Sequence, residues 1–563
     1  MTGTSLFPPG LILVVGALLL PFLHGTLRKS LLLLLPLAAL WMVWRVPDGA
    51  ALTLPFLDYT LTPVEGTRLG RLFATIFAIM AFAGGLFAMN QSRVVELTAA
   101  FVYAGSAMGV ALAGDLITMF VFWEVMALGS TIVLWSAGTG AAYRASMRYV
   151  LMHLFGGVVL MIGVIWQVKA TGSVAFVPMK PETWATWLIL AGFLINAGAP
   201  PLSAWLPDAY PEASPAGMVF LSAFTTKTAV FVLIRGFPGA EVLILFGLYM
   251  VFYGIIYALL ENDMRRILAY SIVNQVGFMV TGIGIGTEMA LNGAAAHAFT
   301  HIIYKALLLM SAGSVLYMTG KRKCSDLGGL FQSMPLTCIC GVIGALAISS
   351  FPLTSGFISK SMIAQGAADQ HLALVWYMLA AASAGVFLHA GIKFPWFVFF
   401  QKDSGLRPPD PPLNMRLAMV LFAALCIGLG VLPGPLYAIL PFPPVNYVPY
   451  TVEHVLHMLQ LLLFSGLAFF ICLPLMKRTE TISLDFDWFY RRLFATLCHR
   501  LSDHSARLHG RFMTRTERRL QRFIAGVFRH HGPEGVLART WPTGSTVLWV
   551  AVLLALYMAL FFL

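Results

Sequence analysis

Long runs of apolar residues separated by short polar segments dominate the pattern of this chain. About sixteen runs are present, and they begin near residues 8, 29, 72, 94, 115, 145, 184, 212, 242, 266, 290, 335, 372, 413, 453 and 543. An α-helix needs about 20 predominantly apolar residues to cross a bilayer. The runs are continuous rather than alternating, which excludes a transmembrane β-barrel. The pattern therefore predicts an all-α polytopic membrane protein with about sixteen transmembrane helices.

Two of the runs are interrupted in a way that predicts broken helices. In the seventh, Asn196 is followed by Ala-Gly-Ala-Pro-Pro and then by the polar sequence WLPDAYPEASP. In the twelfth, the sequence SSFPLTSGFISK carries Pro352 and Gly356. Proline removes a backbone donor and clashes with the preceding turn. Within a membrane, such backbone is tolerated only inside protein or along a hydrated cavity, and discontinuous helices of this kind are typical of transporters.

The last part of the chain follows a different pattern. Between about residues 484 and 531, apolar residues recur mostly at intervals of three and four, and arginines such as Arg500, Arg507 and Arg518 fill the other face. This pattern predicts an amphipathic helix in the membrane interface. Such a helix would anchor the chain to anionic lipids, or pack as a strap against neighbouring helices or a partner subunit.

These patterns divide the chain into five parts. The parts are two helices and a polar loop (1–68), a dense block of helices (69–440), one further helix (441–480), the amphipathic helix (481–540) and a terminal helix (541–563). The first apolar run lacks a positively charged flank and a clear cleavage site, so we expect a retained helix rather than a cleaved signal.

Composition agrees with a membrane location. The chain of 563 residues is 59% hydrophobic and 11% charged, whereas soluble domains carry about 25% charged residues. The net charge of +12 does not indicate a nucleic-acid partner, because lysine and arginine collect in alternate loops, as they do on the cytoplasmic side of membrane proteins. Their distribution predicts that both termini lie outside. We expect a multi-pass protein of the cell inner (cytoplasmic) membrane.

The sequence carries no motif for redox or nucleotide chemistry. None of its six cysteines forms a C-x-x-C pair, so neither an iron–sulfur cluster nor a zinc site is indicated. Neither a G-x-G-x-x-G sequence after a strand nor a P-loop is found. The sequence therefore predicts no cofactor and no metal.

Ionisable residues inside the apolar runs are the candidates for function. Such a side chain at the centre of a membrane costs at least about 2.5 kcal/mol, so a chain with a series of them is expected to use them. Glu124 lies in MFVFWEVMALG, after Asp115 near the mouth, and Lys227 lies in LSAFTTKTAVFVLIR. Burial favours the uncharged form of each and a nearby opposite charge favours the charged form, so the pair could act as a proton switch. The alternatives are a glutamate that caps a broken helix and a lysine that snorkels to the interface.

Three residues of the eleventh run share one helix face. His297, His301 and Lys305 lie at positions i, i+4 and i+8 in HAFTHIIYKALLLM. Two histidines at this spacing can bind zinc, but no carboxylate or cysteine completes a site, and Lys305 would repel a cation. Histidine titrates near neutrality. A proton relay is therefore the preferred interpretation, with packing as the main alternative.

Further charged residues lie later in the chain and around one loop. Lys393, with His389 four residues before it, could end the relay. Lys360 lies beside the break in the twelfth run and is expected either at the pore or near the surface. Asp263 and Arg265, in NDMRRILAYSIVNQVGF, are interpreted as a cytoplasmic loop and helix start with a structural and orienting role.

At these motifs the chain resembles a known family. The segments are FVFWEVMALGS, PLSAWLPDAYPEASP, LSAFTTKTAVFVLIR, NDMRRILAYSIVNQVGF, HAFTHIIYKALLLM, DLGGLFQSMPL and FLHAGIKFPWFVFF. They are similar to segments of the antiporter-like subunits of the complex I superfamily. Such subunits occur in Mrp-type Na+/H+ antiporters, in proton-pumping NADH:quinone oxidoreductases and in membrane-bound hydrogenases. The resemblance covers roughly residues 70 to 435 and is greatest to the D subunits of the multisubunit Mrp-type antiporters.

The resemblance implies a core of about fourteen helices in two inverted five-helix repeats, with breaks in the seventh and twelfth helices, around a hydrated axis. By motif position, Glu124 matches the glutamate of the family's fifth helix and Lys227 the lysine of the eighth. His301 and Lys305 match the relay of the eleventh helix, and Lys393 matches the lysine of the twelfth, which the run count puts in the thirteenth. The amphipathic segment and terminal helix are similar to the lateral-helix extension of some relatives.

One position departs from the family pattern. The family usually carries a lysine in the broken seventh helix, a few residues before P-L-x-x-W-L-x-D, and here that position is Asn196. An amide cannot carry a proton charge, so the family's pairing of the fifth-helix glutamate with that lysine is absent. The N-terminal half would then rely on Lys227 or on water, or would not conduct.

The resemblance implies a proton-translocating subunit of a multisubunit monovalent cation (Na+)/H+ antiporter, with other membrane subunits as partners and no enzymatic activity of its own. One alternative is a pump module of a complex I-like, hydrogenase-like or CO2/bicarbonate-uptake complex. Another is a non-conducting scaffold, which Asn196 favours slightly and the remaining buried charges argue against. The sequence does not identify the transported cation or the stoichiometry.

Overall fold

The chain separates into two compact units, which are described separately. The computed structural model describes residues 7–474 and 485–563. The first unit is Met1–Asp487 and the second is Trp488–Leu563.

Apolar helices dominate the described residues. Thirteen of them are long and apolar enough to cross a membrane. Three shorter apolar helices accompany them, at Pro9–Phe22, Trp184–Ala197 and Pro335–Ile348. Together they account for every apolar run in the sequence, so the predicted all-α polytopic fold is confirmed.

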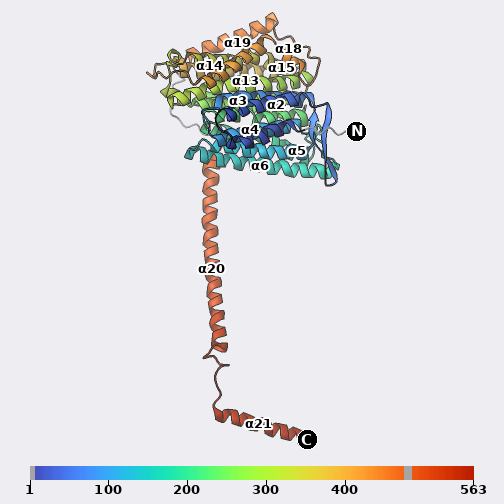
Figure 1. Cartoon of the computed structure of the whole chain (residues 1–563), viewed down its shortest axis with the longest axis vertical. Coiled ribbons are helices and arrows are strands. Elements are labelled where there is room, and N and C mark those ends of the chain that lie inside the picture. The colour runs from blue at the N-terminus through green and yellow to red at the C-terminus, as the bar shows by residue number, and fades with distance from the viewer. Residues whose placement is uncertain (1–6, 475–484) are drawn as a thin grey trace. The chain divides into compact units, whose positions relative to one another are not determined.

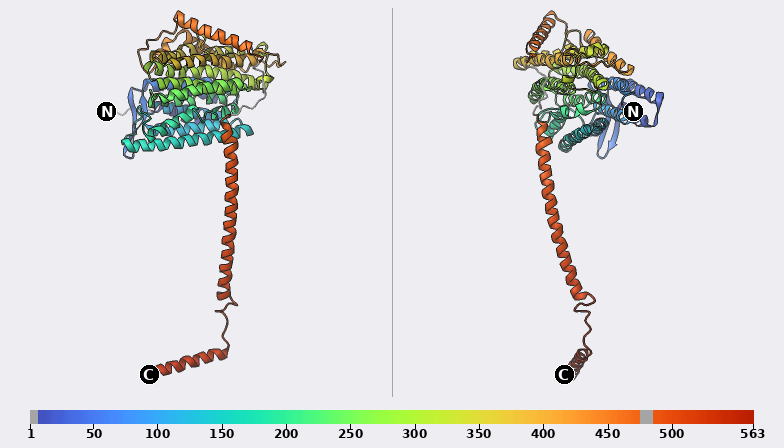
Figure 2. Two further views of the ribbon diagram at one scale, coloured as in Figure 1. Left: turned by 180° about the vertical axis from the view of Figure 1, so that it is seen from behind. Right: turned by 90° about the vertical axis from the view of Figure 1, so that its left-hand side faces the viewer.

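The first unit is a bundle whose helices run side by side, as seen from the side in Figure 1 and along the helices in the right-hand view of Figure 2. Its first half comprises α1 (Pro9–Leu19), α2 (Gly25–Val43), α3 (Arg68–Ala88), α4 (Val94–Leu112), α5 (Leu116–Trp135), α6 (Gly140–Thr171), α7 (Trp184–Ala197), α8 (Trp205–Ala209), α9 (Gly217–Leu221) and α10 (Thr225–Gly236). Its second half comprises α11 (Val242–Leu260), α12 (Met264–Ile285), α13 (Glu288–Thr319), α14 (Pro335–Ile348), α15 (Ser355–Asp369), α16 (Ala373–Val386), α17 (Leu413–Val431), α18 (Gly434–Ala438) and α19 (Val452–Ile471). Short helical turns complete it: η1 (Leu20–Phe22), η2 (Tyr210–Glu212), η3 (Cys324–Asp326), η4 (Leu330–Gln332), η5 (Phe387–Lys393) and η6 (Trp396–Phe400).

A β-hairpin replaces part of the polar loop that the sequence predicted after the first two helices. Strand β1 (Gly49–Phe56) pairs antiparallel with β2 (Tyr59–Gly66). Leu57, in the two-residue turn between the strands, has a φ of 51°. Two-residue hairpin turns are usually signalled by Asn-Gly or Asp-Gly. The turn here has neither, so the sequence pattern did not reveal the hairpin.

Both predicted helix breaks are present, and a third break was not predicted. The seventh apolar helix, α7, ends at Ala197, and α14 is separated from α15 by residues 349–354. The eighth run divides into α9 and α10 around residues 222–224. The third break contains neither proline nor glycine, and therefore only the packed structure reveals it. In the thirteenth run, η5 follows α16 directly and is π-helical, a conformation found frequently at functional sites.

Glycines allow α11 and α12 to pack with their backbones in close contact. A Cβ atom built on Gly247 would lie 2.7 Å from the carbonyl oxygen of Gly277, and one built on Gly277 would lie 2.7 Å from that of Gly247. One built on Gly254 would lie 2.6 Å from the carbonyl oxygen of Tyr270. Small residues at helix contacts are a common means of association inside membranes.

Substitution of Gly277 by valine is expected to destabilise the protein by about 1–3 kcal/mol, because extra methyl groups in a packed contact force the backbones apart. Thermal unfolding of the purified protein measures the effect. Gly428→Val in α17 is the control, since a Cβ at Gly428 meets no atom within 4 Å. Equal shifts of the unfolding midpoint in the two variants would contradict the prediction.

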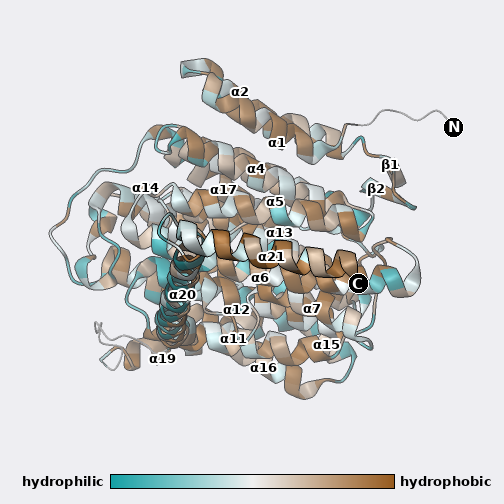
Figure 3. Ribbon diagram, turned by 90° about the horizontal axis from the view of Figure 1, so that it is seen from below, coloured by the Kyte–Doolittle hydropathy of each residue, from teal (hydrophilic) through white to brown (hydrophobic). Residues whose placement is uncertain are grey.

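The second unit consists of helices with contrasting surfaces. It contains η7 (Phe489–Phe494), α20 (Ala495–His531) and α21 (Thr543–Phe562). The predicted amphipathic segment is a continuous helix over the length of α20. In Figure 3 the ribbon of α20 is largely coloured as hydrophilic and that of α21 as hydrophobic. Residues 475–484, which include the start of the segment predicted as 481–540, lie outside the described residues.

Candidate functional site

Helix α13 lies in the interior of the first unit and carries three of the predicted site residues. Every residue from Ala290 to Val315 is buried, and the helix packs against α10, α12, α14, α15 and α17. A helix that is enclosed on all sides would normally be apolar throughout. The ionisable residues of α13 are therefore exceptional, because water cannot solvate them from a free face of the helix.

His297 is held by hydrogen bonds that join α13 to two neighbouring helices. Its Nδ1 lies 3.0 Å from Oγ of Ser359 on α15, and its Nε2 lies 3.1 Å from Oε1 of Gln275 on α12. The hydroxyl of Tyr304 donates to the same Gln275 oxygen at 3.1 Å. Both ring nitrogens of His297 thus have polar partners.

His301 and Lys305 differ from His297 in having no such partners. Neither ring nitrogen of His301 nor Nζ of Lys305 has a hydrogen-bond partner among the described residues, and both side chains are fully buried. Lys227 lies close enough to act electrostatically on both. Buried polar atoms without partners are rare in native proteins and call for an explanation. A site that binds and releases a proton supplies one.

Lys227 and Lys360 each lie at a helix break. Nζ of Lys227 donates to the carbonyl of Ser222 at 2.6 Å, between α9 and α10, and to Oγ1 of Thr226 at 3.1 Å. Nζ of Lys360 donates to the carbonyl of Ile348, the last residue of α14, at 3.0 Å. A broken helix leaves carbonyl groups without intrahelical partners, and each lysine uses one of them.

Lys360 lies in the interior rather than at the surface. Only 3% of the residue is exposed, and Nζ lies 4.8 Å from the centre of the Phe278 ring. A cavity of about 390 Å³ lies beside it and is lined also by Trp376, His454 and His457. Lys360 therefore belongs with Lys227, His297, His301 and Lys305, and these five residues form the central group.

Lys393 closes the end of α11. Its Nζ donates to the carbonyls of Ala258 at 3.1 Å, Leu259 at 2.6 Å and Glu261 at 2.6 Å. A cation at a helix C-terminus interacts favourably with the helix dipole. These bonds stabilise the charged form of Lys393, as carbonyl bonds do for Lys227 and Lys360, and its place at the end of the relay stays a prediction. His389, in the same π-helical segment, is fully buried, and its Nδ1 lies 2.9 Å from the backbone carbonyl oxygen of Gly385.

The N-terminal candidates lie on α5 and α7. Asp115 caps α5, because its Oδ1 accepts from the backbone nitrogen of Thr118 at 2.7 Å, while its Oδ2 accepts from that of Thr62 in the hairpin at 2.7 Å. Glu124 is half-buried, and no ion pair with Lys227 is found in the described ranges. Neither polar atom of the buried Asn196 side chain has a hydrogen-bond partner there.

Gly157 on α6 provides the space that the Glu124 carboxyl group occupies. A Cβ built on Gly157 would lie 2.2 Å from Oε1 of Glu124. We expect Gly157→Ala to displace this flexible carboxyl group and to lower transport by the assembled protein at least fivefold with little loss of stability. Gly156→Ala is the matched control, since its Cβ would lie 3.1 Å from Ile195. Similar transport rates in the two variants, measured in vesicles, would refute a role for the position of Glu124.

A buried histidine was not among the candidates from the sequence. His153, on α6, is 2% exposed, and its Nε2 has no hydrogen-bond partner among the described residues. The sequence pattern could have identified this residue, because His153 interrupts the sixth apolar run in the same way that Glu124 interrupts the fifth. A lone histidine is a weaker signal than a lysine or a glutamate, because its neutral form costs less to bury.

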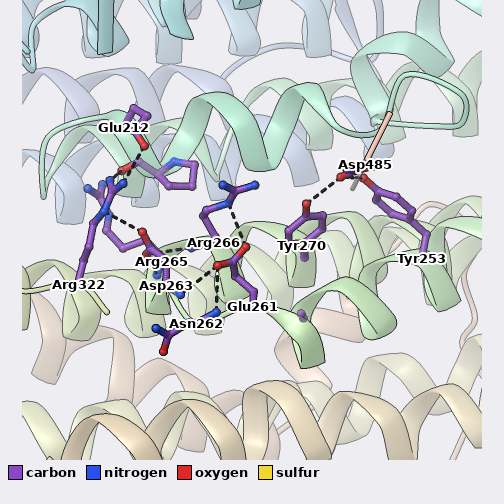
Figure 4. A network of polar contacts seen from close by, with 12 residues as sticks. Glu212, Tyr253, Glu261, Asn262, Asp263, Arg265, Arg266, Tyr270, Arg322 and Asp485 are labelled. Atoms are coloured by element: carbon purple, nitrogen blue, oxygen red, sulfur yellow. Dashed lines mark hydrogen bonds and ion pairs between the residues drawn. The ribbon is translucent and has the colours of Figure 1, made fainter. Parts of the chain in front are cut away.

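Arginines at one end of the bundle hold the loop that follows the broken helix α7. Arg322 pairs with Glu212 at 3.0 Å and with Asp263 at 2.8 Å, as Figure 4 shows. Arg148 forms a bidentate pair with Asp208, with distances of 2.7 and 2.8 Å.

Asp263 and Arg265 have the structural roles that the sequence suggested. Asp263 caps α12 by accepting from the backbone nitrogen of Arg265 at 2.9 Å. In the same region, Asp485 accepts from the hydroxyls of Tyr253 at 2.6 Å and Tyr270 at 2.7 Å (Figure 4).

Known sequences agree with this architecture. Residues 113–387 match the family described as NADH:quinone oxidoreductase/Mrp antiporter, TM. The chain is 29% identical over 396 residues to the D subunit of the Na+/H+ antiporter of Alkalihalophilus pseudofirmus, a match that covers 65% of this chain and 80% of that protein. It is 31% identical over 353 residues to the N subunit of the NADH-quinone oxidoreductase of Desulforudis audaxviator, a match that covers 58% of this chain and 70% of that protein.

Solved structures share the fold. A chain of the Mrp complex from a Dietzia species superposes with a TM-score of 0.76 at 21% identity, over 89% of this chain and 60% of that chain. A chain of respiratory complex I from Thermus thermophilus superposes with a TM-score of 0.67 at 23% identity, over 81% of this chain and 99% of that chain. This chain therefore belongs to the family of antiporter-like membrane subunits that Mrp antiporters share with NADH:quinone oxidoreductases.

Proposed function

We propose that this chain is the proton-translocating subunit of a multisubunit monovalent cation/H+ antiporter in the cell inner membrane. It is a transporter subunit and not an enzyme in itself. The observation that carries the proposal is Lys305, a fully buried amine without a hydrogen-bond partner in the described part of the chain. Such a group is costly in a membrane unless it has a use.

The central group offers a route for protons through the bundle. At the two breaks, carbonyl groups stabilise the charged forms of Lys227 and Lys360. Lys305 and His301, on α13, have no such carbonyl partners among the described residues. A proton that leaves Lys227 would bind Lys305 or His301, pass the hydrogen-bonded His297, and reach Lys360, whose neighbour Ser359 contacts His297. The cavity beside Lys360 would then lead it out of the bundle.

Other membrane subunits would complete the transporter. The Mrp structure from the Dietzia species holds its matching chain in a complex, and this chain spans 60% of that chain. We propose that cation selectivity and coupling depend on such partners. Because relatives include a chain of an NADH-quinone oxidoreductase, a pump module of a redox complex is the second candidate.

The second unit would lie along the membrane surface. The arginines of α20 occupy one side of a helix whose other side is apolar, which suits anionic lipid headgroups. The apolar helix α21 would return the chain to the membrane. Mass spectrometry of lipids that co-purify with the intact protein, compared with a variant whose α20 arginines are replaced by glutamine, tests this role. An unchanged anionic lipid content would oppose it.

Gentle purification of the complex from native membranes tests the proposed function. The co-purifying chains are identified, and the complex is placed in vesicles with a pH-sensitive dye inside. Proton movement driven by a Na+ or K+ gradient, together with small antiporter subunits, would support the proposal. Flavin or iron–sulfur subunits and no cation dependence would instead favour the redox pump, and assembly without any proton movement would favour a scaffold.

A further inference from the structure

His153 combines deep burial with an unused ring nitrogen. Its ring lies between aromatic neighbours, with ring centres 4.1 Å from Tyr149 and 4.8 Å from Trp205. An apolar ring would fill this space equally well. Leaving a buried polar atom without a partner is unfavourable, so packing alone does not explain a histidine at this position.

His153 lies near Asn196, the position at which the sequence departs from the family pattern. Asn196 of α7 lies near enough to interact with His153, although neither side chain achieves hydrogen-bond geometry with the other. Glu124 rests against Gly157, which follows His153 by four residues on the same face of α6. His153 therefore lies one helical turn from the glycine that Glu124 contacts, and near Asn196 of α7.

Hydroxyl groups extend from His153 towards the start of α10. The hydroxyl of Tyr149, whose ring contacts that of His153, donates to Oγ of Ser130 at 2.9 Å and lies 3.5 Å from Oγ1 of Thr225. The next residue, Thr226, accepts a hydrogen bond from Nζ of Lys227. Hydroxyl groups thus reach from Tyr149, a ring neighbour of His153, to the segment that holds Lys227.

We propose that His153 carries protons in the N-terminal half, a task that the amide of Asn196 cannot perform. The carboxyl group of Glu124 gives up a proton and becomes a carboxylate, and Nε2 of His153 binds that proton to give an imidazolium. The uncharged amine of Lys227 then takes a proton by way of the hydroxyl groups, and the neutral imidazole is restored. This inference rests on the proposed function of the chain.

Substitution in the assembled complex tests the inference. We expect His153→Gln, which cannot carry a proton charge, to lower cation-driven proton uptake into vesicles at least tenfold without loss of assembly. Adding Asn196→Lys to that variant restores a titratable group on α7, and we expect it to recover at least a fivefold higher rate. A purely structural role of the ring would not produce this recovery.

Three results would overturn the inference. The first is proton uptake by His153→Gln within twofold of that of the parent complex, in an assay in which Lys305→Gln abolishes proton uptake. The second is a loss of proton uptake in His153→Gln that the added Asn196→Lys substitution does not reverse, together with a similar loss in the single variant His153→Lys. All of these variants must form the assembled complex. The third is unchanged uptake in both His153→Gln and Lys305→Gln, which would also remove the proposed function. If His153→Gln does not assemble, the test uses His153→Lys instead. Retained proton uptake in that variant supports the role of His153 as a proton carrier, and loss of proton uptake opposes it.

Discussion

Replacement of Lys305 by methionine is expected to lower cation-driven proton uptake more than tenfold. The variant complex should remain assembled and be at least as stable as the parent complex. Methionine has a similar length and no charge. Lys305 has no hydrogen-bond partner in the described ranges, so its removal leaves no partner group unsatisfied. Burial of a charge without a partner is unfavourable, and an apolar side chain of similar length avoids that desolvation cost. Transport and stability should therefore respond in different ways.

Two measurements on the same preparation check this expectation. Proton uptake into vesicles reports the function, and the midpoint of thermal unfolding reports the stability. Lys169→Met is the control, because Lys169 is an exposed lysine near the end of α6. Full uptake in the Lys305 variant would show that the buried amine has no part in transport. A large fall in the midpoint would show that Lys305 has an unseen structural partner.

The opposite outcome is expected for Arg265, whose replacement by alanine should destabilise the protein by about 3 kcal/mol or more. The residue is 2% exposed, and its guanidinium donates to the carbonyls of Ala213 and Ser214, both at 2.8 Å. Those carbonyls belong to the loop after the broken helix α7. Alanine would leave both acceptors without this donor, and each unsatisfied buried group costs about 1–3 kcal/mol.

The Arg265 prediction is checked by thermal unfolding and by the yield of assembled complex. Arg144→Ala on α6 removes the same charge from an exposed position and should change little. Arg265→Lys should be intermediate, because lysine keeps the charge but lacks the planar fork that serves two acceptors. Equal midpoints for the Arg265→Ala and Arg144→Ala variants would contradict the structural role.

Helix number and the two proline-containing breaks could be predicted from the sequence alone. The bilayer imposes one length and one composition on every spanning helix, and backbone groups inside it must be satisfied within the helix. These rules act locally, so each run and the breaks near Pro201 and Pro352 are visible without knowledge of neighbours. Burial of Lys227 and Lys305 follows for the same reason, since both lie within apolar runs.

The partner of each buried charge could not be predicted, because it depends on how the bundle packs. Lys393 and Lys305 looked alike in sequence, yet one closes the end of α11 with three carbonyl bonds and the other has no partner in the described residues. The placement of Lys360 in the interior and of His153 beside Asn196 likewise depends on contacts between helices far apart in the chain. A hydropathy pattern records how apolar each segment is. Hydrogen bonds to a lysine depend instead on where other helices begin, end or break, and that is determined when the bundle packs.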